Sequence, residues 1–287
     1  MGWGRFVGLG GALWALCACA PAAPDPKPGP KSGLGDKPAR IVSLDYCADQ
    51  YVLKLADRDR VLAVSPDATA AFSYMREAAE GVPTVRPRAE DVLVLKPDLV
   101  VRAYGGGPNA AALFERAGVP VLQVGWASTV QGEAAGSVSA VITQMADGLG
   151  EPARGAALIA EHQARLDALP GRFVEARALY MTPAGVTTGP GSLVHELLTA
   201  AGLANFETEA GWRPIPLERL VYDQPELIAA AFFDDLAPPP DTWSATRHPI
   251  ARTQLAERKV VPLPGAWTAC GGWFVLDAVE ALAAAAP

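Results

Sequence analysis

Two stretches of this sequence, EDVLVLKPDLVV (Glu90–Val101) and ERLVYDQPELIA (Glu218–Ala229), match in register. Each begins with a glutamate, continues through a helical turn and reaches a proline seven positions later. The proline stops the helix, and an acidic residue and a leucine then open an apolar run that is typical of a buried strand. A single corner of this kind is common in α/β proteins. A matched pair predicts two related lobes that are built on one plan.

The sequence around the first copy predicts an α/β lobe over residues 39–128. Its apolar runs are rich in Val, Leu and Ile and do not alternate with polar residues, which is typical of parallel strands buried on both faces. The strands are expected at residues 40–44, 61–65, 98–103 and 119–125, with helices at 47–56, 89–96 and 109–117.

The second copy lies in a similar alternation, which predicts a second lobe over residues 172–287. The long helical stretch between them, residues 129–171, is interrupted only at Gly150-Glu151-Pro152 and is interpreted as the connection between the lobes. The predicted fold is therefore α/β, with two Rossmann-like lobes that each contain a central, mainly parallel sheet. A long inter-lobe helix joins them, and the ligand cleft lies between the lobes.

The N-terminal residues 1–20 are interpreted as an export signal. The run Phe6–Ala20 is apolar or glycine throughout, which is too short for a comfortable membrane span but suits a secretory signal. It ends in Leu16-Cys17-Ala18-Cys19, which resembles the lipobox of bacterial lipoproteins and makes Cys19 the predicted lipidated residue. The alternative is ordinary cleavage near Ala20 or Ala23. Either way we expect the periplasm or the extracytoplasmic face. Lipidation would make a lipid anchor the only membrane attachment, whereas ordinary cleavage would leave a free soluble protein.

Residues 21–38 are rich in proline and glycine and predict an extended tether. The formal net charge of −7 argues against nucleic acid as a partner, because a nucleic-acid-binding face is basic.

The candidate ligand site follows from the rule that α/β sheets bind ligands at the carboxyl ends of their strands. Four of the seven tryptophans fall in the loops predicted there, where aromatic walls suit a large planar ligand. The alternative for each is that it covers the core of its own lobe. The candidate ligand-binding residues are Tyr46, Cys47, Tyr104, Trp126, Trp212, Trp267, Cys270 and Trp273.

Cys47 and Cys270 lie near opposite ends of the folded region, and three interpretations remain open. They are two small apolar residues, two thiolate ligands for a soft metal, or a disulfide. A disulfide between lobes would restrain the cleft, so it is the least favoured of the three.

Common enzyme motifs are incomplete in this chain. Gly189-Pro190-Gly191 lacks the third glycine of a dinucleotide fingerprint. His195-Glu196 begins a zinc-protease motif, but Thr199 stands where its second histidine belongs. We therefore expect no enzymatic activity and no intrinsic cofactor.

The early strand RIVSL (Arg40–Leu44), the segment GPGSLVHELLTAAGLAN (Gly189–Asn205) and the two repeats together resemble the type III periplasmic binding proteins of ABC importers. The resemblance covers essentially the whole chain from Ala39. It implies a monomer that captures a metal chelate or corrinoid, such as cobalamin, a ferric siderophore or heme.

The same resemblance implies that the chain delivers this ligand to a permease and its ATPase. Glu90 and Glu218 would then contact the permease. Two alternatives are a two-lobed enzyme or cofactor-holding protein of nitrogenase-like architecture, and a structural surface lipoprotein.

Overall fold

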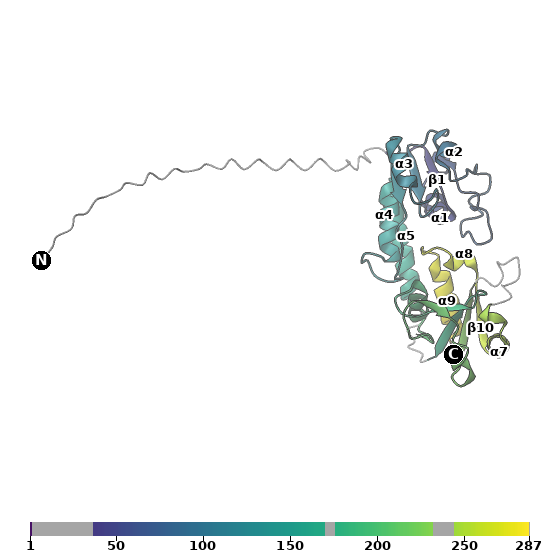
Figure 1. Cartoon of the computed structure of the whole chain (residues 1–287). Coiled ribbons are helices and arrows are strands. Elements are labelled where there is room, and N and C mark those ends of the chain that lie inside the picture. The colour runs from purple at the N-terminus through teal and green to yellow at the C-terminus, as the bar shows by residue number, and fades with distance from the viewer. Residues whose placement is uncertain (2–36, 170–175, 232–243, 287) are drawn as a thin grey trace. The chain divides into compact units, whose positions relative to one another are not determined.

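The first lobe is built on a four-stranded sheet. In the computed structural model, which describes residues 1, 37–169, 176–231 and 244–286, its strand order is β2-β1-β3-β4 and every pairing is parallel. Figure 1 labels β1 of this sheet. The strands are β1 (Ile41–Ser43), β2 (Val61–Ala63), β3 (Leu99–Arg102) and β4 (Val121–Gln123). Both β1 and β3 are buried along their whole length, as predicted from their unbroken apolar runs.

Two apolar clusters cover opposite faces of this sheet. Ile41 and Val101 belong to one cluster, whereas Val42, Val100 and Phe114 belong to the other, because neighbouring residues of a strand point to opposite faces. The helical elements of the lobe are α1 (Tyr46–Leu55), the 3₁₀ turn η1 (Arg58–Arg60), α2 (Ala89–Leu93) and α3 (Ala110–Arg116).

Two helices make up the connection between the lobes: α4 (Val138–Leu149) and α5 (Pro152–Asp167). Gly150 ends α4 in the left-handed conformation, with φ at 71°, and Pro152 occupies the first turn of α5, where a missing N–H costs nothing. The two helices pack closely at Gly155, because a Cβ at this position would clash with Ala146.

α5 makes hydrogen bonds to both lobes. Near its start, Arg154 donates a hydrogen bond of 2.7 Å to the carbonyl of Leu55 in the first lobe. Three turns later, Arg165 donates one of 2.6 Å to Asp277 in the second lobe. The long helical connection thus consists of two helices, and the break between them falls at Gly150-Glu151-Pro152, where the sequence predicted an interruption.

The second lobe repeats the topology of the first. Its parallel sheet has the order β10-β9-β5-β7, so that β5, β7, β9 and β10 take the places of β1, β2, β3 and β4. These strands are β5 (Arg177–Met181), β7 (Ala204–Asn205), β9 (Leu227–Ala231) and β10 (Lys259–Leu263). The two sequence repeats lead into β3 and β9, which are the equivalent strands of the two sheets.

An antiparallel pair, β6 (Val186–Thr188) with β8 (Trp212–Pro214), was not predicted from the sequence. The helical elements of this lobe are α6 (Leu193–Ala200), η2 (Arg219–Val221), η3 (Ala245–Arg247), α7 (Pro249–Glu257), α8 (Gly265–Thr268) and α9 (Val275–Ala285). Within the described residues, no helix is both long and apolar enough to cross a bilayer.

One apolar cluster runs through both lobes. It contains Ile41 of β1 and Ala229 of β9, and the chain from Leu34 to Pro287 forms one compact unit. Where the lobes meet, the hydroxyl of Tyr51 in α1 donates a hydrogen bond of 3.1 Å to the carbonyl of Gly271. The Tyr51 ring also meets Trp273 edge-on, with 5.3 Å between the ring centroids.

Candidate functional site

A cavity of about 360 Å³ is lined by residues of both lobes, a size within the range of small-molecule sites. The first lobe contributes the segment that follows β4, and the second contributes β5, β6, β8 and the segments before α6 and after α8. The lining residues are Trp126, Ser128, Tyr180, Thr188, Gly191, Ser192, Leu193, Val194, Leu197, Gly211, Trp212, Thr268, Ala269 and Gly271.

Two tryptophans, one from each lobe, expose their indoles at this cavity. Trp126 is 73% exposed and Trp212 is 61% exposed, although tryptophan is ordinarily well buried. The Trp212 ring packs edge-on against Tyr180, with 6.1 Å between the ring centroids. Both indoles were predicted ligand-binding residues, and they are the two of that set that line the cavity.

The polar groups of the cavity wall are uncharged. Among the residues that the structure describes, the lining contains no Asp, Glu, His, Lys, Arg or Cys. Burial raises the pKa of Tyr180 far above its ordinary value, so this hydroxyl stays neutral. The Thr188 and Thr268 hydroxyl oxygens are buried without a hydrogen-bond partner among the described residues. The surfaces that the cavity wall offers to a ligand are therefore chiefly the two exposed indoles.

Tyr46 and Tyr104 lie together in a separate aromatic cluster of the first lobe. Their ring centroids are 6.0 Å apart, and Phe72 meets Tyr46 edge-on at 4.9 Å. Burial raises the pKa of both phenols, with the negative charge of Asp45 as a further cause. Neither tyrosine lines the 360 Å³ cavity.

Asp45 occupies the usual ligand position at the sheet of the first lobe. The strand order reverses between β1 and β3, which is where an α/β sheet usually binds ligands. The Asp45 carboxylate fills this position and accepts hydrogen bonds from the N–H groups of Ala103, Tyr104 and Gly105 at 2.7, 3.0 and 2.8 Å. Sequence analysis missed this residue, although an aspartate between a strand and a helix is a usual N-cap.

Trp273 was predicted to bind ligand and is instead a core residue, with 5% of its surface exposed. It packs against Tyr51 and Phe274, and the Lys54 ammonium lies 5.9 Å from its ring centroid. The error arose because Trp273 directly precedes α9 and its ring packs inward at the junction of the lobes. Trp267 is half-buried against the same cluster and does not line the cavity.

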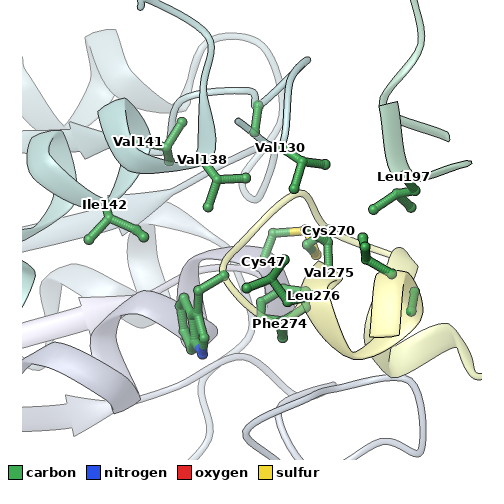
Figure 2. Close-up of a cluster of buried hydrophobic side chains, with 14 of the residues drawn as sticks. Cys47, Val130, Val138, Val141, Ile142, Leu197, Cys270, Phe274, Val275 and Leu276 are labelled. Carbon is green, nitrogen blue, oxygen red and sulfur yellow. A yellow bond between two sulfur atoms is a disulfide. The ribbon is translucent and has the colours of Figure 1, made fainter. Parts of the chain in front are cut away.

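Cys47 and Cys270 form a disulfide, with their Cα atoms 5.6 Å apart. The predicted metal ligation by two thiolates is therefore wrong, because sulfurs bonded to each other are not thiolates. Both residues are buried among apolar side chains that include Val130, Val138 and Val275 (Figure 2). Among the described residues, no group of three or more His, Cys, Asp or Glu is placed to hold a metal ion.

Glu90 and Glu218 are both exposed, Glu90 in α2 and Glu218 at the start of η2. They lie at equivalent places in the two lobes because α2 leads into β3 and η2 leads into β9. Cys19, the predicted lipidation residue, lies outside the described residues.

Comparisons with known proteins agree with this architecture. A family model described as "Periplasmic binding protein" matches residues 41–231, from the start of β1 to the end of β9. A cobalamin-binding protein of Halobacterium salinarum is 27% identical over 212 residues, which cover 70% of this chain. The match covers 56% of that relative, so this chain spans little more than half of its length.

Solved structures show the same fold at low identity. A periplasmic heme-binding protein from Pseudomonas aeruginosa is 21% identical with a TM-score of 0.63, and the match covers 87% of this chain and 92% of that one. A protein of an Fe³⁺-hydroxamate transport system from Saccharomonospora viridis is 17% identical with a TM-score of 0.64, covering 86% and 93%. Because the family model matches more than half of the chain and includes strands of both lobes, this chain belongs to the periplasmic binding protein family.

Proposed function

We propose that this protein is the solute-binding component of an ABC importer and that it captures a metal chelate or a corrinoid. The observation that carries the proposal is the cavity itself, in which Trp126 and Trp212 present exposed indoles from the two lobes above uncharged walls. Aromatic faces of this kind suit a large ligand with a flat or apolar surface.

The metal is proposed to arrive already bound to its organic carrier. The described residues offer no cluster of metal-ligating side chains, and the only nearby sulfur pair is oxidised. The relatives are named for cobalamin, heme and Fe³⁺-hydroxamate, which are all metals inside an organic framework.

Delivery to a membrane permease and its ATPase is the second part of the proposal. Glu90 and Glu218 supply exposed carboxylates at equivalent places on the two lobes, suited to pairing with basic side chains of the permease. An exported monomer, tethered in the periplasm through a lipid on Cys19, would reach such a partner in the membrane plane. No catalytic step is required of the cavity, and its uncharged lining agrees with a role in binding alone.

The test is a titration with three probes: cyanocobalamin, heme and a ferric hydroxamate. Calorimetry on the wild-type protein should show binding of at least one probe, accompanied by quenching of tryptophan fluorescence. Trp126→Ala and Trp212→Ala should each weaken that binding by about tenfold, or about 1.4 kcal/mol. Leu113→Ala, a partly exposed apolar residue on α3 outside the cavity, is the matched control and should bind normally.

Two results would contradict the proposal. One is that none of the three chelates binds. The other is that a chelate binds with equal affinity to the wild-type protein and to both tryptophan variants, which would place the ligand elsewhere.

A further inference from the structure

The most exposed large apolar side chains of this protein fall into two groups. Tyr104, Trp126 and Trp212 belong to the aromatic clusters described above, and the second group has no role in ligand capture. In that second group, Val94 is 78% exposed and Tyr222 is 80% exposed. A single exposed apolar residue needs no explanation, but these two are related by the internal repeat.

Val94 and Tyr222 occupy the same position in the two repeats. Each lies four residues after the exposed glutamate and three residues before the proline. The position two residues after each glutamate is buried in both copies, as are both prolines, so the two corners share one burial pattern. The equivalence of Val94 and Tyr222 is therefore structural as well as sequential.

Equivalent arginines hold both corners in place. In the first lobe, Arg40 donates to the carbonyl of Lys96 at 2.7 Å, and its backbone N–H donates to the carboxylate of Asp98 at 2.9 Å. Lys96 and Asp98 are the residues on either side of the repeat's proline.

In the second lobe, Arg177 makes the same pair of contacts. Its side chain donates to the carbonyl of Gln224 and its backbone N–H to the carboxylate of Glu226, both at 2.8 Å. Gln224 and Glu226 again flank the proline. Each exposed apolar side chain thus lies on a corner whose backbone is held by hydrogen bonds, four positions from an exposed glutamate, so little backbone freedom is lost when a partner binds the corner.

We infer that the permease-docking surface consists of two matched tips, each pairing a carboxylate with an exposed apolar side chain: Glu90 with Val94, and Glu218 with Tyr222. The inference rests on the proposed function and adds the apolar half of the contact. The partner is a protein with two equivalent sites, and each site offers a basic group beside an apolar pocket.

The two tips differ in their apolar area. At the position before Tyr222, Val221 is 62% exposed, whereas the equivalent Leu93 is half-buried. A valine and a tyrosine at the second tip bury more surface than one valine at the first, so the second tip is the stronger contact. The carboxylates govern the salt-dependent association rate, and the apolar side chains govern the lifetime of the complex.

The experiment measures binding of the full chain to the permease–ATPase complex in lipid nanodiscs by surface plasmon resonance over a series of salt concentrations. Val94→Ser should weaken binding by about fivefold and Tyr222→Ser by about thirtyfold, through faster dissociation and without a change in the salt dependence. Glu90→Gln and Glu218→Gln should instead slow association and flatten the salt dependence. Leu113→Ser and Val260→Ser, at partly exposed apolar positions outside the tips, are the matched controls.

Normal dissociation rates for Val94→Ser and Tyr222→Ser, while the wild-type protein binds, would overturn this inference and leave the proposed function intact. No binding of the wild-type protein to the permease would overturn both. Sedimentation showing a dimer that either serine variant disrupts would also overturn it, since the occupant would then be a second copy of this chain.

Discussion

Breaking the Cys47–Cys270 disulfide should lower the stability of this protein substantially while leaving it folded. The bond joins α1 of the first lobe to the segment before α9 of the second, and 223 residues separate the two cysteines. In the chain-entropy model, a loop of that length corresponds to about 5 kcal/mol of stabilisation, at the upper end of the usual range. For a chain of this size, that is a fall in the midpoint of thermal unfolding of about 10–20 °C.

The reduced protein should stay folded because other contacts also join the lobes. The apolar cluster around the disulfide is continuous between them, and Tyr51 donates its hydrogen bond to Gly271. On the far side of α9, Arg165 of α5 binds Asp277 and Glu280 with N–O distances of 2.6 and 2.8 Å. We therefore expect one cooperative transition at lower temperature, with no loss of secondary structure at 25 °C.

The assay compares oxidised and reduced wild-type protein by circular dichroism during heating. Reduction is carried out in denaturant, followed by refolding in reductant, because both cysteines are buried. This comparison keeps both side chains, so it separates the cross-link from the loss of packing that Cys47→Ala with Cys270→Ala would add. Peptide mapping without reductant should show the two cysteines linked. Free thiols at both positions, or melting temperatures within 2 °C of each other, would refute the reasoning.

Three further predictions concern single charged groups. Burial raises the pKa of Asp49 from 3.8 to about 6, so the folded state binds the proton more tightly than the unfolded state. The free energy of unfolding should therefore fall by roughly 3 kcal/mol as the pH rises from 4 to 7. Urea unfolding at several pH values should show that Asp49→Asn removes this contribution. Arg60→Met should destabilise the protein by about 2 kcal/mol, because the buried guanidinium donates to the Glu151 carboxylate at 2.6 Å and to the carbonyls of Pro38 and Leu149, although Lys37 remains paired with Glu151. Arg86→Met breaks a pair at the surface and should change the midpoint of denaturant unfolding very little. Glu90→Gln and Glu218→Gln should leave the ligand affinity measured by calorimetry unchanged. Both should reduce ligand uptake by reconstituted vesicles, most strongly in the double variant. A tenfold loss of ligand affinity in either variant would place that glutamate at the ligand.

The two lobes could be predicted from the sequence because short sequence patterns specify their strands and corners. An apolar run without alternation marks a buried parallel strand, and a proline marks the end of the preceding helix, so the corners at Pro97 and Pro225 could be read without any knowledge of distant contacts. The pair β6–β8 was missed because its pairing joins segments that are separated by α6 and β7, and its strands are too short to show a clear period.

The site was predictable only in part, for a related reason. Trp126 and Trp273 both follow strand-like segments. Which of the two indoles is exposed depends on how the lobes pack, and the sequence pattern does not specify this packing. The same packing brings Cys47 within reach of Cys270, a pairing that the sequence analysis ranked last. Asp45 was missed because its carboxylate acts on backbone N–H groups that lie nearly sixty residues away along the chain.

The disulfide also bears on how the two proposed docking contacts would act together. Glu90 with Val94 and Glu218 with Tyr222 belong to different lobes, and each pair alone offers a small contact. When the first tip binds, the second contact becomes intramolecular, and its effective concentration depends on how well the distance between the tips is maintained. The cross-link, the continuous core and α5 all join the two lobes, so they keep the tips on one body. Restraint of the lobes counted against a disulfide when a closing cleft was expected. In the proposed docking the same restraint is an advantage, because the two lobes engage two equivalent sites of the permease at once.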